Sequence, residues 1–156
     1  MKRILVFASI AVVAICLACN NGQKRTGTGE LTPEAKADSL EKEVLEGHNV
    51  AMPKWSKLPG LQKRTKLLLD SIAKLPAKAQ EAAAPYKEKL EGAYKELGEA
   101  YGSMEKWMDE FDYDSAKNNV EQRIKYLTGE KLKVDKMKEA VLGGFQKADA
   151  LLKEKL

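Results

Sequence analysis

Apolar residues recur every three or four positions from residue 33 to the end of the chain, which predicts amphipathic helices. Thr32 followed by Pro33 is typical of a helix start, because Thr caps free backbone N–H groups and Pro needs no hydrogen-bond partner there. In this first segment the apolar positions share one helix face: Leu40, Val44, His48, Met52 and Trp55. Pro53 and Pro59-Gly60 interrupt the pattern, so the helix must kink or break before Pro76 ends it.

A second helix is predicted from about Ala77 to Phe111, and its apolar seam alternates strictly by four and three: Leu90, Tyr94, Leu97, Tyr101, Met104, Met108 and Phe111. After a turn, Asp114 or Ser115 can cap a third helix that continues to the end of the chain. Three long segments joined by short turns predict an all-α, up-down-up antiparallel three-helix bundle with a Pro-kinked first helix. A four-helix version requires Pro59-Gly60 to form a full turn.

The first 19 residues have the layout of a bacterial lipoprotein signal peptide. A basic start (Met1-Lys2-Arg3) precedes an apolar run, from Ile4 to Ala18, that is broken only by Ser9 and ends at Cys19. This run is shorter than the ~20 residues that a membrane-spanning helix needs. The small Ala18 before Cys19 favours cleavage there, whereas cleavage before Cys16 would place the β-branched Ile15 next to the bond. An uncleaved or ordinary secretory signal is the alternative.

Cleavage before Cys19 divides the chain into three parts. Residues 1–18 form the signal peptide, residues 19–32 a lipidated Cys with a flexible polar tether, and residues 33–156 the helical bundle. Diacylglycerol on the Cys19 sulfur and a fatty acyl group (palmitate) on the new N-terminus supply more than one lipid chain, which makes membrane anchoring stable. A redox or haem-attachment role for Cys16-x-x-Cys19 is disfavoured, because no His follows Cys19 and Cys16 is removed with the signal.

Composition narrows the possible partners. The chain has 27 basic side chains, of which Lys2 and Arg3 lie in the signal peptide, and 23 acidic ones. The mature part is therefore close to neutral and carries no basic block, which argues against nucleic acid as a partner. Lys, Glu, Ala and Leu are abundant and β-branched runs are rare, which favours helix over strand.

Three short motifs resemble a group of small lipoproteins of Bacteroidetes, often labelled viral A-type inclusion protein repeat-like. They are His48-x-x-x-Met52-Pro53, Met104-x-x-Trp107-Met108-x-x-Phe111 and a last helix that ends near Ala148. The resemblance covers about residues 40 to 152 and implies a helical lipoprotein without an established activity. An acidic residue commonly follows the His in that group, whereas this chain has Asn49.

His48 is the only histidine, and two methionines are predicted to lie near it. In an antiparallel pair that closes near Pro76, facing residue numbers sum to about 152, which places His48 opposite Met104 and Met52 opposite Ala100 and Tyr101. Imidazole and thioether groups suit Cu(I), and bundles build such sites between facing helices. The sequence therefore leaves a small Cu(I) or haem carrier as an alternative to a plain core of Met and a hydrogen-bonded His.

No paired nucleophile, phosphate-binding loop or cluster of metal ligands appears in the sequence, so we expect no enzyme activity and no cofactor. Tyr94, Tyr101 and Trp107 are predicted to extend beyond the core as a patch for a protein partner. The leading hypothesis is a non-enzymatic, lipid-anchored protein of the bacterial cell envelope, at the outer membrane facing the periplasm or at the cell surface. Its partner and its oligomeric state stay open.

Overall fold

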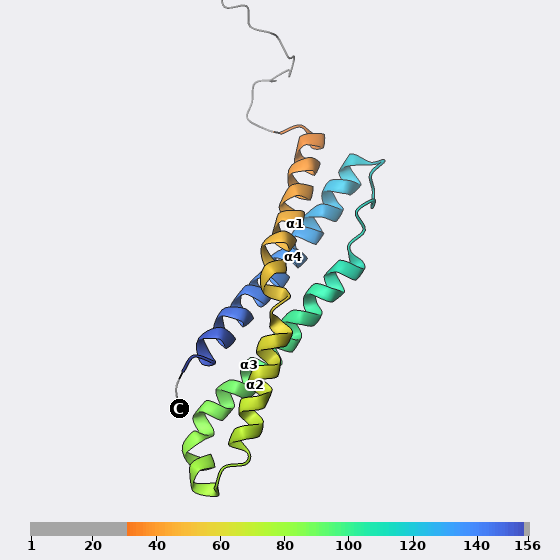
Figure 1. The fold of residues 1–156 in the computed structure, drawn as a ribbon. Helices are drawn as coiled ribbons and strands as arrows, with labels where there is room; N and C mark the ends of the chain where they lie inside the picture. Colours follow the sequence, from red (N-terminus) through yellow and green to blue (C-terminus); the bar gives the residue numbers. More distant parts are fainter. Residues whose placement is uncertain (1–30, 155–156) are drawn as a thin grey trace, which may run out of the picture. The chain divides into compact units, whose positions relative to one another are not determined.

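The computed structural model describes residues 31–154, and these form a three-helix bundle (Figure 1). The first helix consists of α1 (Pro33–Trp55) and α2 (Leu58–Ile72), which meet at a bend of about 38°, and it is followed by α3 (Ala77–Glu110) and α4 (Val120–Leu151). The described part is 84% helical and contains no strand. The predicted all-α fold is therefore confirmed. The signal peptide, Cys19 and most of the tether lie outside the described residues.

The bend follows from two prolines that flank it. Pro53 lies inside α1 and Pro59 in the first turn of α2, so neither can donate the backbone hydrogen bond to the residue four positions earlier. Between them, Ser56 and Lys57 keep right-handed helical dihedral angles, and the Ser56 N–H still donates to the Met52 carbonyl at 3.1 Å. The chain therefore bends without turning back, which agrees with the predicted kink.

The bend changes the packing partner of the first helix. α1 packs chiefly on α4, whereas α2 packs chiefly on α3. α1 and α4 run parallel, since Glu41 pairs with Arg123 and Lys54 lies over the Phe145 ring farther along both helices. α3 is antiparallel to both and packs on α4 over most of its length (Figure 1).

α1 approaches α4 closely through small residues. Ala37, Gly47 and Ala51 are buried on α1, whereas Leu40, His48, Met52 and Trp55 of the predicted face are only half-buried. A Cβ atom built on Gly47 would lie 3.1 Å and 3.2 Å from the two γ-carbons of Val134. The predicted apolar face is thus rotated from the buried one, because the small residues that permit the contact carry little hydrophobic signal.

The same rotation occurs on α3. Its buried stripe includes three alanines and one tryptophan and, from Leu90 on, advances in steps of three and four: Ala83, Leu90, Ala93, Leu97, Ala100, Met104 and Trp107. Tyr101 and Met108 of the predicted seam are half-buried at its edge, and Tyr94 is exposed. The predicted seam thus combines two neighbouring faces of the helix.

The start of the last helix differs from the prediction. Asn119 caps α4 by accepting a hydrogen bond from the Gln122 N–H at 3.0 Å, so neither Asp114 nor Ser115 is the cap. Residues 112–119 form a loop in which Ala116 adopts a left-handed φ of 56°. In contrast, the predicted cap at Thr32 is confirmed, since its hydroxyl accepts from the Ala35 N–H at 3.2 Å.

We expect Gly47→Ala and Gly102→Ala to change stability in opposite directions. No atom lies within 4 Å of a Cβ built on Gly102, so Ala there should raise the free energy of unfolding by about 0.5–1 kcal/mol through helix propensity. Ala at Gly47 should lower it by about 1 kcal/mol, because overpacking against Val134 exceeds that gain. Urea denaturation of each variant measures both effects.

Val134→Ala supplies the control, because it removes the γ-carbons that crowd position 47. In that background Gly47→Ala should become stabilising. Equal gains from the two glycine substitutions in the parent chain would contradict the close approach of α1 and α4.

Candidate functional site

His48 faces Trp107 across the bundle, one helical turn from the predicted partner Met104. The two ring centroids are 5.5 Å apart. Farther down, Trp55 stacks on Tyr101 at 4.8 Å, so facing residue numbers sum to about 156. The shift arises at the α2–α3 turn, where Gln80 donates to the carbonyls of Ala73 and Leu75 at 3.1 Å and 2.7 Å. The first turn of α3 thus bonds to the end of α2 and to the turn itself.

The predicted His/Met layer is spread over different depths of the core. Met104 is fully buried, whereas His48 and Met52 are half-buried. Nδ1 of His48 lies 3.1 Å from the Asn49 side-chain oxygen. Within residues 31–154 no group of three or more His, Cys, Asp and Glu side chains is arranged to hold a metal ion. The Cu(I) or haem site therefore stays a prediction from sequence.

Trp107 is held by a buried carboxylate. Its indole N–H donates to Glu130 at 3.1 Å, and Lys133 donates to the other oxygen of the same carboxylate at 2.8 Å. This bond raises the pKa of Lys133 above its ordinary value. Phe111 stacks on the opposite part of the indole, with ring centroids 4.8 Å apart. A fixed indole is well suited to form the floor of a binding surface, because little side-chain entropy remains to be lost.

The groove between α3 and α4 has this indole in its floor. It encloses about 370 Å³, with Trp107 and Met137 lining it and Lys106, Lys133 and Lys136 around it together with Glu110. A second stretch of groove shares Ser103 and Ala140 with it and continues past Gly143 and Gly144. In the first stretch the apolar floor and the lysines suit an amphipathic segment that carries acidic residues. The second stretch is lined by Glu96, Glu99 and Glu139 with Lys147.

The predicted patch of three aromatic residues is not one exposed surface. Trp107 is only 5% exposed, and Tyr101 is covered by Trp55, whose N–H donates to the Tyr101 carbonyl at 3.1 Å. Tyr94 exposes 37% of its surface, and its carbonyl accepts from Gln62 at 3.2 Å. Sequence periodicity placed the three on the outside of the core, but the α1–α2 bend brings Trp55 onto Tyr101 and the α4 carboxylate draws Trp107 inward.

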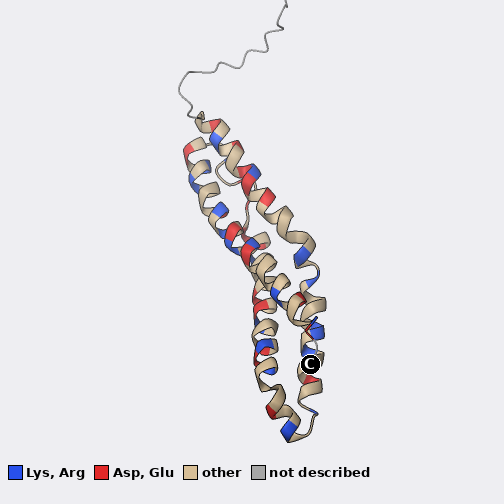
Figure 2. Ribbon diagram, turned by 90° about the vertical axis from the view of Figure 1, so that its left-hand side faces the viewer, with Lys and Arg blue, Asp and Glu red and all other residues tan. Residues whose placement is uncertain are grey.

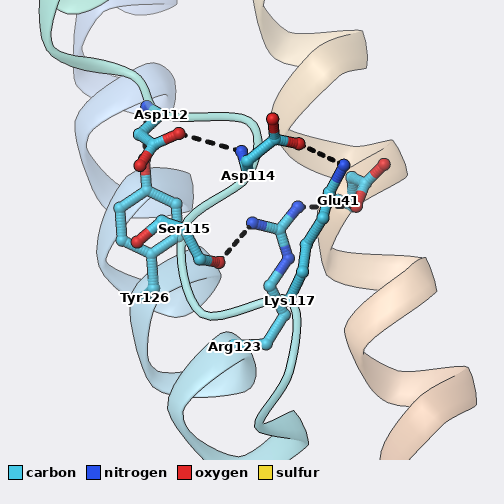
Figure 3. A network of polar contacts seen from close by, with 7 residues as sticks. All are labelled: Glu41, Asp112, Asp114, Ser115, Lys117, Arg123 and Tyr126. Atoms are coloured by element: carbon cyan, nitrogen blue, oxygen red, sulfur yellow. Dashed lines mark hydrogen bonds and ion pairs between the residues drawn. The ribbon is translucent and has the colours of Figure 1, made fainter.

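A polar network fastens the α3–α4 loop to α1 and α4 (Figure 3). Arg123 is 5% exposed, and its guanidinium donates to Glu41 at 2.7 Å and to the Ser115 carbonyl at 2.8 Å. Tyr126 on α4 accepts from the Asp112 N–H at 2.7 Å. Asp114 forms an ion pair with Lys117 within the loop. Sequence reasoning missed Arg123 because a charged residue at a core position breaks the apolar pattern.

The network lowers the pKa of Glu41. Hydrogen bonding to the Tyr113 hydroxyl and then to Arg123 favours the ionised carboxylate and holds its pKa below the ordinary 4.5. Lys117 adds a smaller effect in the same direction, while desolvation opposes it. The pKa of Tyr113 is raised in turn, chiefly because its hydroxyl bonds to Glu41.

Among the described helices, none is both long and apolar enough to cross a membrane. No family model, curated protein or solved structure matches the chain. The resemblance to Bacteroidetes lipoproteins stays a prediction from its short motifs.

We expect acid to remove the stability that Glu41 contributes. Because its pKa is lower in the folded than in the unfolded chain, this contribution is complete above the unfolded value and is lost as the pH falls through the folded value. Glu41→Gln should therefore lower the free energy of unfolding by about 1–2 kcal/mol at neutral pH and by less near pH 3.

Chemical denaturation at several pH values, with Glu46→Gln as an exposed control on the same helix, measures the difference. A deficit in Glu41→Gln that is unchanged by acid would contradict the ionic character of this contact.

Proposed function

We propose that the chain is a non-enzymatic, lipid-anchored protein of the bacterial cell envelope that presents a helical bundle to a protein partner. The single observation that carries the anchoring is the sequence from Met1 to Cys19, with its basic start, short apolar run and small residue before a cysteine. Lipidation of Cys19 would hold the protein at the outer membrane, facing the periplasm or the cell surface. Several acyl chains would make this attachment stable.

The α3–α4 groove supports the interaction role. Trp107 and Met137 supply apolar surface. Of the three lysines at the edges, Lys106 pairs with Glu110 and Lys133 with the buried Glu130, whereas Lys136 forms no ion pair within residues 31–154. The complementary occupant is an amphipathic helix of a partner protein, with apolar residues toward Trp107 and acidic residues toward Lys106 and Lys136. Burial of the partner helix's apolar face would contribute roughly 25 cal/mol of favourable free energy for each Å² removed from water.

Fatty-acid labelling in a bacterial host tests the anchoring. Cells that express the full chain should incorporate labelled palmitate into it and retain it in the membrane fraction. Cys19→Ala should abolish the label and release the protein, whereas Cys16→Ala should still be labelled. Label that enters the Cys19→Ala protein equally would contradict the anchor.

A photo-crosslinking residue at Ala140 tests the groove, with the same residue at Ser71, on the outside of α2, as the control; both positions are exposed. We expect the residue at Ala140 to give one dominant adduct with a partner protein, and the residue at Ser71 to give none of that size. Changing Lys106, Lys133 and Lys136 to Glu should reduce the yield of the Ala140 adduct at least tenfold. An adduct at both positions, or an Ala140 adduct that ignores the charge changes, would contradict a helix bound in this groove.

A further inference from the structure

The end of the bundle that carries the α2–α3 turn is basic. Residues 63–78 hold one acidic side chain, Asp70, and five exposed basic ones, here named the basic tip: Lys63, Arg64, Lys66, Lys74 and Lys78. Figure 2 shows basic positions at this end of the ribbon. Asp70 is already paired with Lys66. Within residues 31–154 the other four basic groups form no ion pair within 4 Å.

Two leucines project among these charges. Leu67 exposes 57% of its surface and Leu75 exposes 39%, although large apolar side chains normally avoid water. On α2, Lys63 and Leu67 are four residues apart and therefore share one face, and Lys74 lies in the turn that follows. Leu75 follows in the turn, next to Lys74. The basic tip thus combines exposed apolar and cationic groups over a short stretch of chain.

We propose that the basic tip binds an anionic phospholipid surface. Lys and Arg close to such a surface each contribute about a fivefold gain in affinity. The basic tip gathers such residues from α2, the turn and the start of α3. The two leucines favour a lipid surface over an acidic protein, because they can enter the head-group layer while the long lysine side chains reach outward to the phosphates.

This inference does not depend on the lipid anchor or on the α3–α4 groove. The α2–α3 turn, which carries the basic tip, lies at the opposite end of the bundle from the start of α1 (Figure 1). Residues 33–72, which hold α1 and α2, run between these two ends and correspond to about 60 Å along the bent helix. A bundle held at Thr32 would therefore have its second lipid contact at a distance set by α1 and α2.

Vesicle co-sedimentation tests the proposal with residues 31–156, which form one compact unit that contains every described helix. We expect binding to phosphatidylcholine vesicles that contain phosphatidylglycerol, weaker binding at high salt, and none to phosphatidylcholine alone. Changing Lys63, Arg64, Lys74 and Lys78 to Glu should reduce the affinity more than tenfold. Circular dichroism checks that each variant keeps its helix content.

A matched control separates the site from net charge. Lys36, Lys42, Lys57 and Lys125 are exposed outside the tip and outside the α3–α4 groove, and changing these four to Glu alters the net charge equally. The control variant should bind the phosphatidylglycerol vesicles with an affinity within about threefold of the parent's. An equal loss in both variants would overturn the proposal in favour of unspecific attraction, and an unchanged tip variant would overturn it outright.

The leucines separate a lipid surface from an acidic polymer. Leu67→Ser with Leu75→Ser should weaken vesicle binding at least threefold and leave binding to soluble polyglutamate unchanged. Tighter binding to polyglutamate than to the phosphatidylglycerol vesicles, with no effect of the leucines on either, would replace the lipid proposal with an acidic protein partner.

Discussion

The bend between α1 and α2 is the constraint on which the bundle depends. Two missing backbone donors, at Pro53 and Pro59, loosen one turn of an otherwise continuous helix. That turn redirects the chain, so that α1 packs on α4 and α2 packs on α3. Trp55 stabilises the crossing, since it stacks on Tyr101 and donates to its backbone at the same point. A straight helix would keep a single packing partner along its length.

The sequence was sufficient to predict the helices, the bend and the cap at Thr32, because these depend on local chemistry. It was not sufficient for the register of the core. Large apolar residues in the sequence point to Tyr94 and Tyr101, whereas the buried positions include Ala93, Ala100 and Gly47, whose hydrophobic signal is weak. The register differs by about one turn from the one that the sequence predicts, since His48 lies against Trp107 and Gln80 bonds to the carbonyls at the α2–α3 turn.

The candidate site likewise combines residues that the sequence indicates with contacts that only the fold reveals. The sequence drew attention to Trp107, but its role follows from Glu130, a carboxylate at a position where the spacing of α4 calls for an apolar residue. Arg123 occupies another such position and bonds to Glu41 and to the loop before α4. Charged residues at core positions are recognised only when their partners are known, and those partners are 23 and 82 residues away in the chain. Both contacts give the bundle polar specificity that an all-apolar core would lack.

The parallel arrangement of α1 and α4 decides how the bundle responds to force. Tension that enters at Thr32 pulls α1 along its own axis, so the interface with α4 is loaded in shear, and its contacts must yield together and not one after another. The Glu41–Arg123 pair and the close approach of Gly47 to Val134 share that load around the middle of α1. Tension along α1 is therefore resisted by many contacts of the α1–α4 interface at once.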